Sequence, residues 1–274
     1  MSDKRPIGIF DSGVGGLTVA HEVFKLLPQE NVVYFGDVGR TPYGGRSKEI
    51  ITNFTRQDLT FLIEQNVKFI ICACNTVSAV ALDEVQKDYK MEMIGVIEPG
   101  AKHAVEKTKS GRIGVIGTPA TINSNAYARV IHKIDPKLKV FSLACPLFVP
   151  LVEEGYIDKD ATHLIARDYL QTMLDVEIDT LVLGCTHYPL LKEVIGSVMG
   201  DGVGLVDSGE VIAKEVYRFL ADKDLLNPQS SQRPGPSGEQ KFFVSDVPDK
   251  FTNLASRFLG QPVDKVTRVD ISEY

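Results

Sequence analysis

The sequence predicts an α/β protein of two related halves, each built on a doubly wound, mainly parallel sheet. Short β-branched runs alternate with longer stretches of helical period along the chain, which is typical of strand–helix–strand units with right-handed crossovers. Two strand-and-turn segments of the first half also resemble segments of the second half in sequence, and these resemblances are called echoes below. With 43% hydrophobic and 24% charged residues among 274, the chain has the composition of a soluble globular protein with a sizeable core.

The expected strands are short apolar runs of the kind that parallel sheets bury on both faces. They are Ile7–Phe10, Val32–Phe35, Phe69–Cys72 and Ile94–Val96 in the first half, and Ile113–Ile116, Val140–Leu143, Leu181–Leu183 and Leu205–Val206 in the second. The helices expected between them are Leu17–Leu27, Ser47–Glu64, Val77–Lys87, Ala161–Leu174, Pro189–Val198 and Gly209–Leu220.

The helix over 47–64 shows the clearest pattern, because Ile51, Phe54, Phe61 and Leu62 share one face behind Ser47, a suitable N-cap. Near the other end of the chain, Asn227–Gly238 is rich in Pro, Gly and Ser and predicts a linker. After it, Lys241–Val244 and Asp249–Leu259 predict one more strand and helix. These could close the C-terminus back onto the first half.

The echoes suggest that the halves are related. Ile7–Ser12 resembles Ile113–Thr118, and Ile70–Thr76 resembles Leu181–His187 in the same order. Since buried parallel strands resemble one another in any case, short matches of this kind remain open to a second interpretation as unrelated strands.

Composition and charge narrow the class of protein. The net charge is −6, and no basic patch suits nucleic acid, so we expect no nucleic-acid partner. The N-terminus lacks a signal-peptide core, and no apolar stretch is long enough to span a bilayer. We therefore expect no membrane association and a cytoplasmic location, where the four cysteines stay reduced and available for chemistry.

The Gly13–Gly16 loop after the first strand does not fit a dinucleotide or Walker motif, because Thr18 and Val14 occupy positions that require Gly and Lys. Asp11 also places a carboxylate beside the turn, which would repel a phosphate. The loop is suited instead to a small carboxylate bound by backbone N–H groups.

Cys74 and Cys185 are the most informative residues. Each follows an expected strand and precedes hydroxyl or amide residues, and ligands of doubly wound sheets bind where strands end. A metal site of Cys72, Cys74, Cys185 and His187 is an alternative, but Cys-x-Cys and Cys-x-His spacings are unusual for structural zinc. A cysteine hydrolase that uses one of the thiols with His187 is a second alternative. Cys72 and Cys145 are expected in the core or a loop.

Two opposed thiols would suit inversion of a carbon centre, because one thiolate removes a proton while the opposite thiol returns one. A free thiol is only a few per cent ionised at neutral pH, so it needs help. Asp11 and His187 are candidate helpers, one for each half. Each could instead have a structural role, Asp11 as a helix N-cap and His187 as a hydrogen-bonded loop residue.

The motifs together resemble those of the glutamate racemases within the cofactor-independent aspartate/glutamate racemase superfamily, over essentially the whole chain. The matching segments are Asp11–Gly16, Pro42–Gly44, Cys74–Thr76, Pro146–Leu147 through Glu153–Gly155, and Gly184–Pro189. The chain departs from the family pattern at Gly39 and Gly45, where Ala and Pro are expected.

The resemblance implies a two-domain fold with the active site in the cleft between pseudo-symmetric domains, here expected at 1–97 plus 208–274 and at 98–207. It implies interconversion of L- and D-glutamate as the small-molecule substrate, no cofactor, no metal, a homodimer, and a role in supplying D-glutamate for peptidoglycan. Because the first strand begins at Ile7, we expect no N-terminal regulatory extension. Aspartate racemase activity, or an amino-acid-binding protein without catalysis, are the remaining alternatives.

By the same resemblance, Cys74 is the acid/base that faces D-glutamate and Cys185 the one that faces L-glutamate. Asp11 and His187 tune them, and Glu153 is a further catalytic candidate. The residues implied in substrate binding are Asp11, Ser12, Tyr43, Gly44, Asn75, Thr76, Thr186 and His187.

Overall fold

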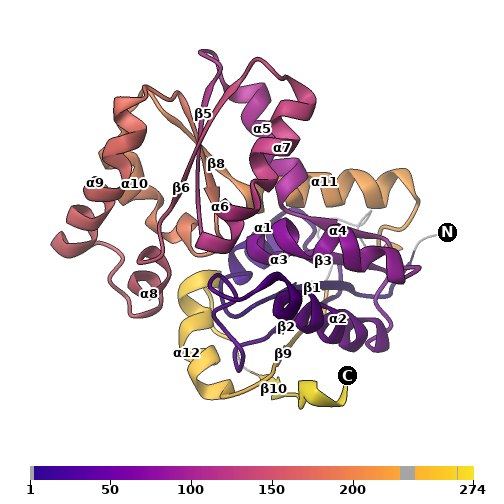
Figure 1. The fold of residues 1–274 in the computed structure, drawn as a ribbon. Helices are drawn as coiled ribbons and strands as arrows, with labels where there is room; N and C mark the ends of the chain where they lie inside the picture. Colours follow the sequence, from indigo (N-terminus) through magenta and orange to yellow (C-terminus); the bar gives the residue numbers. More distant parts are fainter. Residues whose placement is uncertain (1–2, 229–237, 264) are drawn as a thin grey trace.

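The computed structural model describes residues 3–228, 238–263 and 265–274, and these form two sheets in which every strand pairing is parallel (Figure 1). The first sheet has the order β10-β9-β2-β1-β3-β4 and the second the order β6-β5-β7-β8. The strands are β1 Ile7–Asp11, β2 Val32–Gly36, β3 Phe69–Cys72, β4 Met93–Gly95, β5 Arg112–Gly117, β6 Lys139–Ala144, β7 Thr180–Gly184, β8 Gly204–Asp207, β9 Gln240–Val244 and β10 Val266–Arg268.

Helices connect the strands and cover them. They are α1 Leu17–Leu26, α2 Lys48–Glu64, α3 Asn75–Val80, α4 Leu82–Val85, α5 Ile97–Lys107, α6 Pro119–Ser124, α7 Ala126–Ile134, α8 Phe148–Glu153, α9 Asp160–Asp175, α10 Lys192–Met199, α11 Ser208–Asp222 and α12 Pro248–Leu259. Short 3₁₀ turns lie at Gln86–Asp88, Tyr188–Leu191 and Ile271–Glu273.

Alternate residues of each central strand pack into different cores, as a doubly wound sheet requires. Ile9 of β1 belongs to the core that includes α1 and α11, whereas its neighbour Phe10 packs in the core that includes α2. In the second sheet, Val182 packs with α5 and α7, while Leu183 faces the core that includes α10. The predicted fold class is therefore confirmed.

The two halves share their topology. The order β2-β1-β3-β4 in the first sheet repeats as β6-β5-β7-β8 in the second, so β1 corresponds to β5 and β3 to β7. These are the strands whose sequences echo one another. The echo therefore reflects equivalent structural positions rather than a chance likeness of buried strands.

Several local predictions differ from the structure. The single helix expected at Val77–Lys87 is divided into α3, α4 and a 3₁₀ turn, because Ala81 leaves helical geometry with φ of −123°. The helix expected from Pro189 begins as a 3₁₀ turn and becomes α-helical only at Lys192. The helices α5, α6, α7 and α8 and the strand β10 are additional to the prediction.

The C-terminal strand and helix do return to the first sheet, where β9 pairs with β2 and β10 pairs with β9. Of the predicted linker, residues 229–237 lie outside the described residues. Among the residues that are described, no helix is long and apolar enough to cross a membrane.

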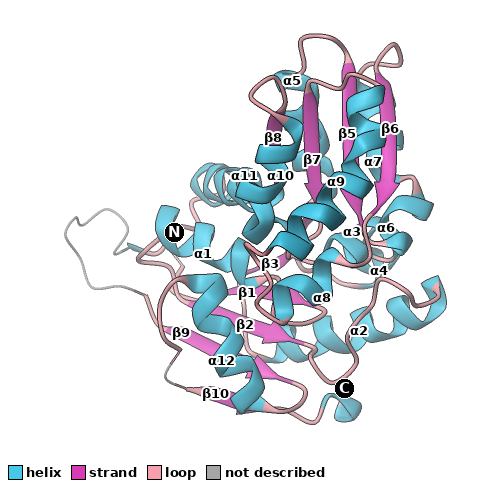
Figure 2. Ribbon diagram, turned by 90° about the vertical axis from the view of Figure 1, so that its left-hand side faces the viewer, coloured by secondary structure: helices cyan, strands magenta, loops and turns pink. Residues whose placement is uncertain are grey.

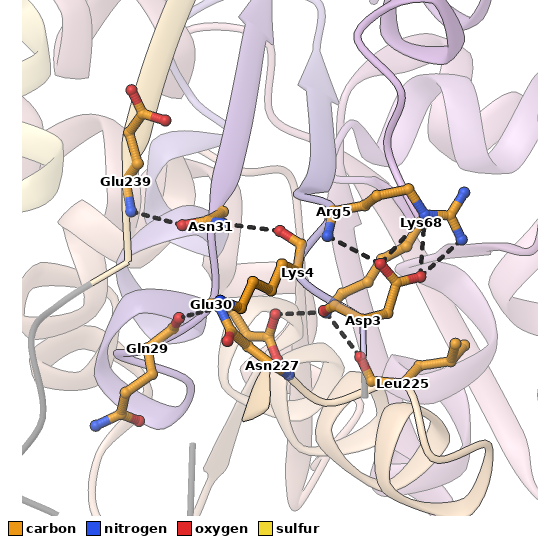
Figure 3. Close-up of polar contacts among 10 residues, drawn as sticks. All are labelled: Asp3, Lys4, Arg5, Gln29, Glu30, Asn31, Lys68, Leu225, Asn227 and Glu239. Atoms are coloured by element: carbon orange, nitrogen blue, oxygen red, sulfur yellow. Dashed lines mark hydrogen bonds and ion pairs between the residues drawn. The ribbon is translucent and has the colours of Figure 1, made fainter. Parts of the chain in front are cut away.

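A buried ion pair fixes the point where the chain returns from the second half. Lys68 donates to Glu30 Oε2 at 2.6 Å and to the backbone oxygens of Asp3 and Leu225 at 2.8 and 2.7 Å (Figure 3). Glu30 in turn accepts from the backbone N–H of Asn227 at 2.7 Å. Because the Lys68 and Glu30 side chains are fully buried, this network ties Asp3 and the segment after α11 to the entrances of β2 and β3.

Candidate active site

The predicted site residues follow the carboxyl ends of equivalent strands. Asp11 is the last residue of β1, Cys74 follows β3 and begins α3 as its N-cap, and Cys185 directly follows β7. In Figure 2 the arrowheads of β5, β6 and β7 point toward the first sheet. The second half therefore directs Cys185 and its neighbours toward the residues at the ends of β1 and β3.

Asp11 and Ser12 connect the two cysteine motifs. Ser12 Oγ lies 3.5 Å from the sulfur of Cys74, while Asp11 Oδ1 accepts from the hydroxyl of Thr186, next to Cys185, at 3.5 Å. The same turn approaches the second half at Gly15, where a Cβ would overlap Thr186 Oγ1. Glycine is required there because the backbone of one half passes against side chains of the other.

Cys185 begins a series of three polar side chains in contact within the second half. Its sulfur lies 3.9 Å from Nδ1 of His187, and Nε2 of His187 lies 3.0 Å from Glu153 Oε1 at the end of α8. Cys185 and His187 are each only 6% exposed. Buried polar groups in such a chain strengthen one another's interactions, so Glu153 orients the imidazole that faces the thiol.

The environment of Cys74 keeps its thiol protonated. Burial, and next the charge of Asp11, raise the pKa of Cys74 to about 12, and the contact with Ser12 offsets only part of this. Burial also raises the pKa of Asp11, against the opposing effects of His187 and the N–H groups of Gly16 and Gly13. At neutral pH the Cys74 thiol is therefore protonated.

The side chain that faces Cys185 is a cation. Burial by itself lowers the pKa of His187, but its hydrogen bonds with Cys185 and Glu153 outweigh burial and raise that pKa to about 10. His187 is therefore an imidazolium at neutral pH, and its charge lies beside the sulfur of Cys185. The two motifs thus offer one protonated thiol and one sulfur paired with a cation.

Side chains after Cys74 supply hydrogen-bond donors. Asn75 is 3% exposed; its Oδ1 accepts from Tyr127 at 2.7 Å, and its Nδ2 has no partner among the residues that the structure describes. Thr76 shares a hydrogen bond of 2.9 Å with Thr118. An unpaired buried amide N–H is a costly group that a carboxylate ligand would satisfy.

Tyr43 and Gly44, both expected to bind substrate, make hydrogen bonds within the protein. The hydroxyl of Tyr43 donates to Asp37 and lies 3.3 Å from Asp58 Oδ2, so it is already engaged. Gly44 accepts from the backbone N–H of Ala120 at 3.0 Å. This segment connects the first half to the start of α6.

Sequence reasoning missed several residues around this site. Thr118 occupies the position in the second half that Ser12 holds in the first, so the echo already contained this signal. Asp37 follows β2 as Asp11 ends β1, and could have been found by the same rule. Arg257 and Phe258 of α12 had no such signal, because only the return of the C-terminus brings them to α8 and His187.

The remaining cysteines have other surroundings. All four cysteines are free thiols, and Cys72 is fully buried in β3 with its sulfur 3.3 Å from Ser78. Cys145 is also fully buried and lies at the end of β6. Within the described ranges, no group of three or more His, Cys, Asp or Glu side chains is arranged to hold a metal ion.

Comparisons with known proteins agree with one another. The family profile for Asp/Glu/hydantoin racemases matches residues 44–216. The chain is 50% identical over 267 residues to a glutamate racemase of Geobacter metallireducens, which covers 97% of each protein.

Solved structures are similar as well. A glutamate racemase of Francisella tularensis in complex with D-glutamate superimposes with a TM-score of 0.91 at 42% identity, over 99% of this chain and 100% of that one. A glutamate racemase of Thermus thermophilus in complex with β-chloro-D-alanine gives a TM-score of 0.89 at 43% identity and covers both chains fully.

Proposed function

This chain belongs to the Asp/Glu/hydantoin racemase family, and we propose that it interconverts L- and D-glutamate without a cofactor, by proton transfer between two cysteines. It is therefore an isomerase that acts on an amino acid. The observation that carries the two-cysteine scheme is the Asp11–Ser12 turn, which contacts Cys74 on one side and the Cys185 motif on the other.

The reaction needs one base and one acid on opposite faces of the α-carbon. With L-glutamate bound, the thiolate of Cys185, paired with the His187 imidazolium, removes the α-proton, and the thiol of Cys74 delivers its own proton to the other face. The C–H bond that breaks on one face of the α-carbon is replaced by a C–H bond on the opposite face, so the configuration of the carbon is inverted. The two sulfurs exchange protonation states, so D-glutamate is converted by the same steps in reverse.

Substrate binding must stabilise the carbanion that forms between the two transfers. A turnover near 10 per second allows a barrier of only about 16 kcal/mol. Donors placed in advance around the α-carboxylate can supply the stabilisation if water is excluded. We assign this role to the unpaired Asn75 amide together with Ser12, Thr76 and Thr186. We also assign Tyr43 and Gly44 to the binding site, where they hold the segment that packs against Thr118 and Ala120.

The choice of glutamate rests on the relatives, since those at 50% and 42% identity are named glutamate racemases. A product of this kind suits the supply of D-glutamate for peptidoglycan in the cytoplasm. We also propose a homodimer of subunits divided into domains at 1–97 plus 208–274 and at 98–207. The pairing of β9 with β2 supports that division.

Exchange of the α-proton in heavy water tests the scheme. With L- or D-glutamate and no added cofactor, the protein should incorporate deuterium at the α-carbon and change the optical rotation. A protein that only binds the amino acid would show neither effect. A cysteine hydrolase would instead give a trapped acyl intermediate, and an aspartate racemase would prefer aspartate in direct competition.

Single substitutions separate the roles of the two thiols. Cys74→Ser and Cys185→Ser should each reduce racemisation by several orders of magnitude while the far-ultraviolet circular dichroism is unchanged. Cys145→Ala, which removes another buried thiol, is the matched control and should keep its activity. Full activity in either serine variant would refute the two-cysteine scheme.

The serine variants should also fail asymmetrically. Since L- and D-glutamate are equal in free energy, kcat/KM must be the same in both directions, so the asymmetry appears in isotope effects. In Cys74→Ser, α-deuteration should slow the reaction of D-glutamate more than that of L-glutamate. Cys185→Ser should show the reverse order.

A further inference from the structure

A buried polar cluster lies beside the proposed site, in the segment that follows β2. Arg40 donates from Nε to Asp37 Oδ2 at 2.6 Å and from Nη2 to Asp58 Oδ1 on α2 at 2.9 Å. Tyr43 donates to Asp37 and approaches Asp58. The guanidinium of Arg40 also lies 4.1 Å from the ring centre of Phe54. The cluster therefore joins two carboxylates through one cation and one hydroxyl.

The charges in this cluster do not balance if both carboxylates are ionised. Asp37 and Asp58 are both fully buried, and within the described residues Arg40 is the one cation that pairs with them. Oδ1 of Asp37 has no hydrogen-bond partner in the described part of the chain. A second buried negative charge without a partner would cost several kcal/mol. A single proton on the pair would leave one negative charge against Arg40.

The cluster also determines where the next segment lies. Tyr43 is 1% exposed and packs on Phe54, with ring centres 5.3 Å apart. Directly after it, Gly44 pairs with the backbone of Ala120 and lies so close to Thr118 that a Cβ at this position would meet the threonine Cβ at 2.8 Å.

From Thr118 the contact continues to Thr76, two residues after Cys74, through their shared hydrogen bond. A displaced Tyr43 would therefore shift the contact between the halves next to one of the proposed proton-transfer residues.

We propose that Asp37 and Asp58 share one proton around Arg40, and that Asp58 is a positioning residue that fixes the Tyr43–Gly44 segment against the second half. This inference rests on the proposed racemase function only for its kinetic consequence. The shared proton itself is a property of the folded chain, whatever reaction the chain catalyses.

The surroundings of Asp58 are consistent with a neutral carboxyl. Burial, and next the charge of Asp37, raise the pKa of Asp58 well above its ordinary value, although Arg40 and Tyr43 act in the opposite direction. Asp11 of β1 also raises it.

Burial, and next Cys74, raise the pKa of the Cys72 thiol on β3 well above its usual value, and Asp11 and Asp58 act in the same direction. The acidic groups near Asp58 therefore act together against a second negative charge.

Kinetics of three variants test the positioning role. Asp58→Asn keeps the shape of a neutral carboxyl, and its amide can donate to the Tyr43 oxygen, so KM for glutamate should stay within about twofold of wild type. Asp58→Ala removes the support of Tyr43 and should raise KM about tenfold or more, with a smaller change in kcat, as expected for lost binding contacts. Asp37→Asn combined with Asp58→Asn leaves Arg40 uncompensated and should also raise KM.

The matched control is Asp88→Asn, the same substitution in a carboxylate that pairs with Arg56 at the surface, and it should leave KM unchanged. If Asp58→Asn raises KM as much as Asp58→Ala does, the carboxyl is ionised and the shared proton is refuted. If Asp58→Ala keeps the wild-type KM, the positioning role is refuted.

Unfolding measurements test the shared proton without any activity. A carboxyl whose pKa is raised on folding takes up a proton when the chain folds, so the folded state loses stability as pH rises above the unfolded value. In urea titrations from pH 5 to 7, the folding equilibrium constant of the wild type should fall about tenfold more per pH unit than that of Asp58→Asn. Parallel pH dependences would overturn the proposal. If the wild type shows no α-proton exchange, only the proposed function fails.

Discussion

Replacement of His187 by asparagine probes the half of the site around Cys185. The asparagine amide can lie where Nδ1 of His187 now faces the sulfur, but it carries no charge and cannot reach Glu153 in the same way. The variant therefore removes the cation while it keeps a hydrogen-bond donor beside the thiol. The two residues that contact the ring nitrogens, Cys185 and Glu153, are unchanged.

The expected effect follows from the distance of 3.9 Å between Cys185 Sγ and His187 Nδ1. Unit charges at this separation attract by about 4 kcal/mol at an effective dielectric constant of 20. Loss of this attraction corresponds to a factor of about a thousand in a step that depends on the cation beside the sulfur. A thiolate without the cation is a stronger base and recovers part of the loss. We therefore expect kcat/KM to fall between about 30-fold and 1,000-fold.

The assay is racemisation followed by circular dichroism, with α-protonated and α-deuterated substrates in both directions. Proton removal by Cys185 should become rate-limiting, so the isotope effect on L-glutamate should increase more than that on D-glutamate. The matched control is His163→Asn on α9, where the histidine contacts Asp158 at the surface, and its kinetics should be unchanged. A decrease smaller than tenfold in His187→Asn, with equal isotope effects in both directions, would refute the ion-pair reasoning.

Three further predictions concern stability and the approach of α12. Lys68→Met should lower the free energy of unfolding, measured in urea, by about 3–5 kcal/mol, because the buried Glu30 carboxylate loses its cation. The double variant Lys68→Met with Glu30→Leu should recover most of that stability. Equal losses in the single and the double variant would contradict this. Since the pKa of Cys74 is raised from 9.0 to about 12, this thiol should cost the folded protein about 1.4 kcal/mol of stability per unit as pH rises above 9. Cys74→Ser should remove that contribution, and urea titrations at pH 9 and 10 measure it. Arg257 donates to the Val152 and Glu153 carbonyls at 3.1 and 3.2 Å. Arg257→Ala should therefore lower the free energy of unfolding by about 1 kcal/mol and lower kcat/KM. The control Arg268→Ala, at an exposed position, should change neither value in parallel assays.

The sequence predicted the strands well because each strand is marked by a short pattern of neighbouring residues. Each central strand is a short apolar run with a polar residue or glycine after it, so β1, β3, β5 and β7 could be located without knowledge of their neighbours. The helix over α2 was located with its N-cap, and Ser47 does accept from the backbone N–H of Ile50. The prediction failed at the break between α3 and α4, because Ala81 leaves helical geometry where no Gly or Pro marks the end of a helix.

The sequence predicted those residues of the candidate site that lie at the ends of strands. Asp11, Cys74 and Cys185 follow from the rule that ligands bind at the carboxyl ends of parallel strands. The engagement of the Tyr43 hydroxyl by Asp37 and Asp58 could not be read from the sequence. Carboxylates 6 and 15 residues away form a buried cluster only when α2 packs beside the segment after β2.

The sequence by itself determined the alternation of strands and helices, the relation of the two halves and the identity of the two candidate thiols, because these depend on short-range patterns. Only the tertiary structure decided which charges surround each thiol. Burial beside Asp11 keeps Cys74 protonated, and a buried chain through His187 to Glu153 places a cation beside Cys185. The strength of an electrostatic interaction depends on distance and on the exclusion of water, and the folded arrangement of segments far apart in the chain sets both.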